Sequence, residues 1–365
     1  MIFLMPLVLR AQNTTIGGVI NSYASGIHQI SSTQLKINQI ALFSVNDTVL
    51  VYQAQGAVPV LTNNSTFGNI QNIGNAGNYD FSIIQSIDGV NKIITLSCPL
   101  SNNYDDNLFQ VVKVKTYTNA TVNTTLTCDA WDGTKGGILV MFVKGTLTLN
   151  ANIDVTGKGF RGANSPIINS LNKCSNDGGI YSYYYTVNGY DSAGLKGEGI
   201  ALIPINYARG RGKFINGGGG GNGINSAGGG GSHAGAGGNG GRESDACYSV
   251  TQNYGGIGGL NILSTTGTSA QKLFMGGGGG TGTYEEYSND VTKGGNGGGI
   301  VIIIANNLAG NNKQITANGE TVPIATTYES AGGGGGGGSV IFISPNVNGN
   351  VLLNALGGNG GSSNN

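Results

Sequence analysis

Residues that could carry out acid–base or nucleophilic chemistry are scarce in this sequence. The chain contains only two histidines, His28 and His233, so a Ser–His–Asp or Cys–His triad would have to use one of them. His233 follows Ser232 inside a glycine tract, where no obvious neighbour would hold the imidazole in one orientation. We therefore interpret His233 as incidental to function.

Close pairs of acidic residues are the other candidates for chemistry: Asp105 with Asp106, Asp129 with Asp132, and Glu285 with Glu286. Two carboxylates facing each other across a cleft could hydrolyse a glycosidic bond, so a β-helix enzyme acting on polysaccharides stays open as an alternative. Asp129 and Asp132 could instead bind calcium, although the glycine–aspartate nonapeptide repeat is absent. GxGxxG patterns recur too often to indicate a dinucleotide site. We expect no catalytic residues, no metal ligands and no cofactor.

Four cysteines, Cys98, Cys128, Cys174 and Cys247, could form disulfide bonds in an exported protein. The four residues allow three pairings, and the pairs Cys98–Cys128 and Cys174–Cys247 are favoured because each lies within one region of the chain. None of them belongs to a CxxC motif or to a cluster with histidine, which argues against a zinc site.

The composition excludes several classes of partner. Glycine accounts for 68 of the 365 residues, whereas only 10% of residues are charged. Basic and acidic side chains balance at 18 each, so charge would not attract the chain to nucleic acid or to an anionic membrane. Hydrophobic residues make up 38% of the chain, which is enough for a core and argues against general disorder.

The first twelve residues resemble the apolar part and the small-residue exit of a secretory signal peptide. A basic leading region is missing, which is typical of a truncated signal; the alternative is a buried N-terminal strand. No later stretch has the ~20 apolar residues that a transmembrane helix needs. We therefore expect residues 1–12 to be a signal peptide and the protein to be exported, with the secretion machinery as a partner.

Residues 13–130 have the pattern of an N-terminal β-domain, a small barrel or sandwich. Apolar and β-branched runs at 39–45 and 48–52 are separated by Asn46-Asp47, and those at 79–84 and 92–96 flank Asp88-Gly89, a hairpin signal. Residues 111–115 alternate in the manner of a half-buried strand.

Residues 131–365 contain an internal repeat. A glycine lead, a strand of apolar residues, a polar turn and a second strand follow one another at 136–155, 297–319 and 339–358. Such a repeat predicts stacked coils that bury their apolar faces against one another. The fold class that we expect is all-β: the N-terminal domain followed by a glycine-rich β-solenoid.

Glycine tracts lie between the repeats, at 217–221, 228–231, 276–280 and 332–338. They could be flexible linkers, but linkers usually mix glycine with serine and seldom adjoin strands. The second interpretation, which we favour, is ordered packing, because side-chain-free backbone allows extended segments to approach closely and to hydrogen-bond side by side. The array would need many hydrogen bonds to offset the entropy that glycine loses on ordering.

Tyrosines are concentrated in one stretch, at Tyr181, Tyr183, Tyr184, Tyr185 and Tyr190. They either pack under solenoid loops or form an exposed patch that contacts a carbohydrate or protein ligand, because tyrosine provides contact area at a low entropy cost. The packing interpretation has a slight preference, and these residues remain the candidate contact aromatics.

Two long sequence segments, residues 128–138 and 145–162, resemble the N-terminal part of large glycine-rich secreted proteins of Bacteroidetes. Residues 273–280 and 294–300 are similar to that family as well. The resemblance implies export by the type IX route and an adhesin-like or gliding-associated role. It also implies O-glycosylation at Thr48 and Ser192, which lie in short acidic–hydroxyl–apolar motifs. The chain ends in Ser362-Ser-Asn-Asn365 without a C-terminal sorting domain, which suggests a fragment.

The function that we expect is a non-enzymatic, exported structural or adhesive module at the cell surface, part of a larger adhesin for attachment or gliding. A carbohydrate or protein on the opposing surface would be its ligand. A polysaccharide-active β-helix enzyme and a phage-like receptor-binding tip are the alternatives.

Overall fold

The computed structural model describes residues 12–164, 182–185, 193–222, 226–241, 254–262, 272–283, 293–324 and 330–362. The fold is all-β, as predicted, and the helical elements in these residues are short, such as the 3-10 turns η1 (Ile40–Leu42) and η2 (Ile205–Tyr207). Among the described residues, no helix has the length and apolar character needed to cross a bilayer. Residues 1–11, most of the predicted signal peptide, lie outside the described residues.

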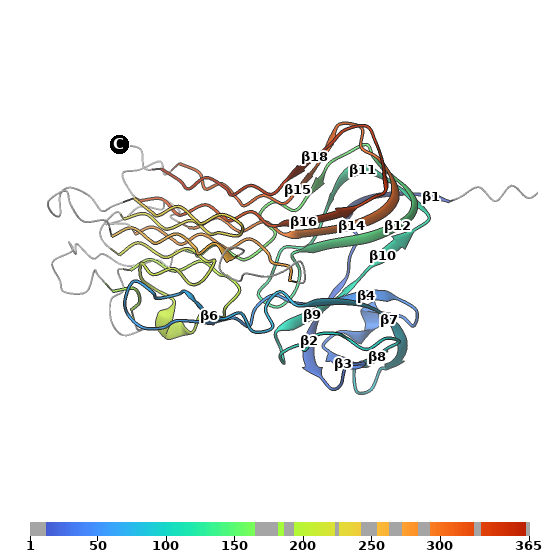
Figure 1. The fold of residues 1–365 in the computed structure, drawn as a ribbon, viewed down its shortest axis with the longest axis horizontal. Coiled ribbons are helices and arrows are strands. Elements are labelled where there is room, and N and C mark those ends of the chain that lie inside the picture. Colours follow the sequence, from blue (N-terminus) through green and yellow to red (C-terminus); the bar gives the residue numbers. More distant parts are fainter. Residues whose placement is uncertain are drawn as a thin grey trace, which may run out of the picture.

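Six antiparallel strands close into a small barrel (lower right in Figure 1). Around the barrel they are β2 (Tyr23–Gln29), β3 (Gln34–Ile37), β8 (Ile93–Leu96), β7 (Tyr79–Asp88), β4 (Thr48–Gln53) and β9 (Phe109–Lys113). Alternate side chains point inward, so Leu35, Val51, Ile94 and Phe109 fill the interior. The hairpin predicted at Asp88-Gly89 joins β7 to β8.

Two predictions for the N-terminal region were wrong. Residues 39–45 form no strand, because only Phe43 of this run is buried and Ile40–Leu42 make the 3-10 turn η1. The predicted boundary at residue 130 also fails, since β1 (Asn13–Val19), β10 (Lys115–Tyr117) and β11 (Asn119–Thr127) join the larger sheet instead of the barrel.

The larger sheet is parallel and stacks the predicted repeats on one another. Its remaining strands are β12 (Ile138–Leu149), β13 (Ile153–Asp154), β14 (Ile300–Ala309), β15 (Lys313–Thr316), β16 (Ser339–Ile343), β17 (Asn346–Asn348) and β18 (Val351–Asn354). First strands pair with first strands and second strands with second: Leu139, Val301 and Val340 are in register, and so are Ile153, Ile315 and Leu353.

A second buried cluster, separate from the barrel interior, lies between the parallel sheet and the barrel. Ile138, Val140, Ile300 and Ile302 from the parallel sheet belong to the same buried cluster as Tyr52 from the barrel. Residues 138–141 of β12 and 300–303 of β14 are therefore covered on both faces, which explains why these first parts of the two strands are continuous apolar runs that do not alternate.

The segment between β4 and β7, residues 54–78, leaves the barrel and runs beneath the glycine tracts (Figure 1). We call it the strap; it carries the short strands β5 (Val58–Pro59) and β6 (Ile70–Asn72). Backbone hydrogen bonds fasten it to the glycine-rich part: Gly56 donates to the carbonyl of Ile200, and the carbonyls of Gly68 and Gly77 accept from Ile215 and Leu273.

The glycine tracts lie side by side as extended segments (left in Figure 1), and we call them together the glycine array. Its described members are residues 194–199, 217–222, 226–232, 237–241, 255–259, 276–283, 293–299, 332–338 and 357–361. Close approach excludes side chains: a Cβ on Gly279 would overlap the carbonyl oxygen of Gly333, and one on Gly280 would overlap that of Gly219. Glycine is thus required by the spacing of the segments.

Candidate functional site

The acidic residues predicted as catalytic candidates, Asp105 and Asp106, bind different partners and do not face each other as a pair. Asp106 pairs with His28, with 2.7 Å between carboxylate oxygen and Nδ1, and both side chains are exposed. The carboxylate of the adjacent residue, Asp105, accepts hydrogen bonds from the side-chain amides of Gln53 (2.7 Å) and Asn75 (2.8 Å). The two neighbouring carboxylates therefore bind different side chains and do not act on a common site. Glu285 and Glu286 lie outside the described residues.

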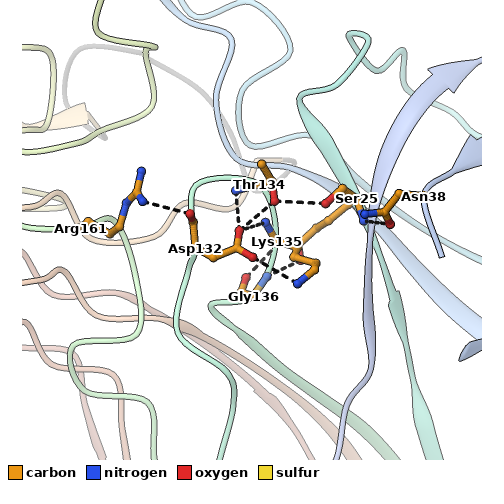
Figure 2. Close-up of polar contacts among 8 residues, drawn as sticks. Ser25, Asn38, Asp132, Thr134, Lys135, Gly136 and Arg161 are labelled. Atoms are coloured by element: carbon orange, nitrogen blue, oxygen red, sulfur yellow. Dashed lines mark hydrogen bonds and ion pairs between the residues drawn. The ribbon is translucent and has the colours of Figure 1, made fainter.

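The carboxylate of Asp132 closes a tight loop at the junction of barrel and parallel sheet (Figure 2). One of its oxygens accepts hydrogen bonds from the N–H and hydroxyl of Thr134, both at 2.8 Å, and from the N–H of Lys135 at 2.9 Å. The other oxygen forms an ion pair with Nζ of Lys135 at 3.2 Å. The hydroxyl of Ser25, in β2 of the barrel, donates to the Thr134 hydroxyl at 3.1 Å.

These contacts decide what Asp132 can do chemically. Partial burial alone would raise its pKa, but the hydrogen bonds from Lys135 and Thr134 outweigh that effect and lower the pKa of Asp132 to about 2. It is therefore an ionised acceptor, unsuited to act as a general acid near neutral pH. In the parts of the chain that the structure describes, no three His, Cys, Asp or Glu side chains are placed to hold a metal ion. The Asp132 loop fastens the barrel to the sheet.

The predicted Cys98–Cys128 disulfide is not formed, because both cysteines are free. Cys98 is exposed after β8 of the barrel, whereas Cys128 follows β11 and is buried in the core of the parallel sheet. The pairing assumed that both belong to one domain, and the shift of β11 to the parallel sheet removes that premise. Cys174 and Cys247, the second predicted pair, lie outside the described residues.

Two described members of the tyrosine run, Tyr183 and Tyr184, pack inward against the strap. Tyr184 stacks on Phe67 with ring centroids 5.3 Å apart, and Tyr183 contacts the same ring at 6.4 Å. Phe67 itself is fully buried. Tyr183, Tyr184 and Tyr185 are only half-buried, so each keeps some surface in contact with solvent. Tyr181, Tyr190 and the predicted glycosylation site Ser192 lie outside the described residues, and Thr48 is half-buried at the start of β4.

A buried lysine, which the sequence analysis missed, lies beside this aromatic cluster. Nζ of Lys196 donates to the carbonyl oxygens of Tyr183, Arg209 and Gly210, each at 2.7 Å, and lies 5.3 Å from the centroid of the Phe67 ring. Burial lowers the pKa of Lys196, while three carbonyl acceptors match the three donors of an ammonium group. The sequence around it, Gly194–Gly199, shows only a lysine among glycines, and this pattern does not predict that the lysine is buried.

His233 is better fixed than the sequence indicated. Its Nε2 lies 3.2 Å from the hydroxyl of Ser339 at the start of β16, and that hydroxyl donates to the carbonyl of Phe274 at 2.7 Å. Burial lowers the pKa of His233 to about 4, so the ring is neutral at physiological pH. The expectation that nothing holds this ring was wrong, since a residue 106 positions away supplies the contact.

A groove of about 340 Å³ lies at the edge of the glycine array. Four segments of the array line it, 227–231, 236–241, 332–335 and 357–361. Apart from Ala227, Ala236, Asn239 and Asn359, every lining residue is glycine. The groove therefore offers backbone N–H and C=O groups almost without side chains.

Comparisons with known proteins give no family assignment. No family model matches the chain, and no curated protein matches it either. Among solved structures, a tailspike protein, gp49 of Pseudomonas phage LKA1, is similar over 38% of this chain and 23% of its own, at 12% identity and a TM-score of 0.18. A similarity this weak carries no argument about function.

Proposed function

We propose that this chain is an exported, non-catalytic structural module of a surface adhesin, built as a β-solenoid that continues into packed polyglycine segments of polyproline-II type. The observation that supports the proposal best is the pattern of hydrogen bonds made by the tract at 276–281. Its N–H groups donate to three segments in turn: Gly276 and Gly279 to Gly298 and Gly295, Gly277 and Gly280 to Ser232 and Gly229, and Gly278 and Thr281 to Glu198 and Leu195.

Each partner segment recurs after three residues, which is the number of residues per turn of a polyproline-II helix. Carbonyl groups of the same tract accept from three further segments: from Phe160 and Ala163, from Gly218 and Gly221, and from Gly333 and Gly336. The tract is therefore surrounded on all sides by other backbone. Such mutual bonding offsets the entropy lost by ordered glycine and makes a stiff body.

A stiff, weakly charged body is suited to holding other segments away from a cell surface. Only 10% of the residues are charged and net charge is zero, so non-specific attraction to other molecules is small. The tyrosines of the run 181–190 are the candidate contacts for a carbohydrate or protein ligand on the opposing surface. Secretion would bring the chain to the outside of the cell.

Immunolabelling of intact producing cells with an antibody against residues 131–365 tests the proposal. We expect signal at the cell surface and reduced attachment or gliding in a deletion strain, restored by the wild-type gene. Complementation with a Gly279→Ala chain should restore less, because the added methyl would overlap the carbonyl of Gly333. Protein found only in the culture medium, together with hydrolysis of a polysaccharide that is lost on substituting Asp105 or Asp106, would contradict it.

A further inference from the structure

The segment 332–338 uses only part of its hydrogen-bonding capacity. Its N–H groups donate in two directions: Gly333 and Gly336 to Gly280 and Gly277, and Gly335 and Gly338 to Glu320 and Ala317. The third set, the N–H groups of Gly334 and Gly337, has no acceptor among the described residues. Gly334 is nevertheless buried, and it lines the groove. One bonding direction of this segment therefore opens into the groove.

The segment 226–232 adjoins the segment 332–338, because the N–H of Gly231 donates to the carbonyl of Gly334, and it shows the complementary pattern. Its N–H groups donate in three directions, and the carbonyls of Ala227 and Gly230 accept from Gly256 and Gly259. The carbonyls of Gly228 and Gly231, which line the groove, accept no hydrogen bond in the described parts of the chain. They are three residues apart, so the open acceptors repeat with the period of the array.

The groove thus has an open donor on one wall, the N–H of Gly334, and open acceptors on another, the carbonyls of Gly228 and Gly231, which have the spacing found between neighbouring segments inside the array. From these positions we infer that the groove binds an extended glycine-rich segment of a partner protein, which joins the array as one more polyproline-II strand. The inference does not rest on the proposed adhesive role. It continues an interface that already exists, the packing of one glycine tract on another.

The chemistry of the walls selects this partner over others. Neither an aromatic ring nor a charged side chain lines the groove, so it lacks the stacking surfaces that bind sugars and the cations that bind anions. Its free groups are main-chain donors and acceptors, the same groups that bind an added strand in β-augmentation. The wall formed by residues 332–335 would be about 12 Å long at ~3.1 Å per residue, so a run of several glycines would span it.

Peptide binding to the purified full chain, measured by calorimetry or fluorescence anisotropy, tests the inference. The first peptide is a run of glycines flanked by lysines for solubility. The second replaces the central glycines with alanine, and the third replaces them with sarcosine, which adds no Cβ but lacks the N–H group. We expect the glycine peptide to bind at least about tenfold more tightly than either, since two or three hydrogen bonds or a steric overlap are at stake.

A pair of variants locates the binding in the groove. A Cβ at Gly360 would lie 3.6 Å from the N atom of Gly334, an ordinary contact, so Gly360→Val should fold and cover that N–H. Gly235 has nothing within 4 Å of its Cβ position and does not line the groove, so Gly235→Val is the matched control. We expect Gly360→Val to weaken the binding of the glycine peptide at least about tenfold and Gly235→Val to leave it unchanged.

Three peptide results would overturn the inference: equal binding of the glycine and sarcosine peptides, no binding of any peptide, or binding that Gly360→Val does not affect. Sedimentation of the protein without peptide tests whether a second copy of this chain occupies the groove. A dimer that Gly360→Val dissociates would mean that a second copy of this chain fills the groove, and the assignment to a separate partner would be wrong. The sarcosine comparison uses wild-type protein, so the test holds even if a variant fails to fold.

Discussion

At the scale of single residues, the buried polar groups hold segments that have few side chains of their own. Lys196 lies among glycines, and its ammonium joins the backbone at Tyr183 to the backbone at Arg209 and Gly210. A charged group is expensive to bury unless its donors are satisfied, and here all three have carbonyl acceptors. Lys272 does the same for the strap, donating to the carbonyls of Gly74 and Ala76.

Replacing Lys196 with methionine keeps the stem but removes the donors. Each of the three carbonyls also accepts a backbone hydrogen bond, from Gly212, Tyr185 and Gly220, so the loss is partial. We expect Lys196→Met to lower the free energy of unfolding by about 1–3 kcal/mol in denaturant titrations. The exposed Lys36 is the control, and Lys36→Met should change stability little. Equal effects of the two substitutions would show that the Lys196 contacts do not stabilise the fold.

The low pKa of His233 predicts a loss of stability in mild acid. In the unfolded chain a histidine takes up a proton near pH 6.5, whereas burial keeps folded His233 neutral until about pH 4. The unfolded state therefore binds more protons between these values, and stability falls as the pH is lowered from 6.5 towards 4. Thermal unfolding of wild type and His233→Gln across this range measures the effect, which the variant should lack.

NMR titration of a His28→Gln chain follows His233 alone, because the sequence has no other histidine. We expect its imidazole resonances to shift near pH 4. A midpoint near 6.5 would mean that the ring is solvated and that the contact with Ser339 does not hold it.

The two described cysteines should differ in reactivity. Cys98 is exposed, whereas burial raises the pKa of the Cys128 thiol to about 12, so Cys128 has almost no thiolate at neutral pH. In a chain with Cys174 and Cys247 replaced by serine, we expect maleimide to label Cys98 within minutes and Cys128 only after unfolding. Recovery of a Cys98–Cys128 disulfide peptide without reduction would contradict the fold at β11.

At the scale of elements, the composition of the sequence predicted where strands form better than it predicted which sheet each strand joins. The sequence repeat was recognised because apolar runs follow paired glycines. As that repeat predicted, β12, β14 and β16 pair in parallel and in register. Local sequence could not assign β1 and β11, which pair with each other across about a hundred residues in the larger sheet. Residues 39–45 have strand-like composition, but pairing partners, which no local pattern reports, decide whether a strand forms.

The candidate site was only partly predictable for the same reason. The tyrosine run was evident from the sequence, but its packing on Phe67 depends on the strap, which leaves the barrel more than a hundred residues earlier. The groove could not be predicted, because it is defined by which N–H and C=O groups of the array lack partners. Glycine tracts are identical in composition whether their groups are paired or free.

Two glycines in the array should respond to alanine in opposite ways. At Gly279 the new methyl would overlap the carbonyl oxygen of Gly333, and backbone on that side has no room to move. We expect Gly279→Ala to cost about 2 kcal/mol or more in thermal or denaturant unfolding. At Gly238 nothing lies within 4 Å of the Cβ position, so alanine should be neutral or stabilise by about 0.5 kcal/mol through the unfolded chain. Similar behaviour of the two variants would mean that the tracts are not packed.

At the scale of the whole molecule, the barrel, the parallel sheet and the glycine array are joined at several points. The hydroxyl of Tyr23 in the barrel donates to the carbonyl of Ile138 at 2.7 Å, and the side-chain amide of Asn21 donates to the carbonyl of Val140 at 2.8 Å. The strap connects the barrel to the array on the other side. The glycine segments are thus fixed at one end by a conventional apolar core and along their length by one another.

Hydrogen–deuterium exchange of the glycine tracts tests this account most directly. Peptides covering 217–222 and 276–283 would be followed by mass spectrometry beside peptides from β12 and β14. Because the tract N–H groups donate to neighbouring backbone, we predict exchange at least about a thousandfold slower than in a free peptide, comparable to that of the two strands. Exchange of the tracts at the rate of an unstructured chain, with the strands still protected, would contradict the account.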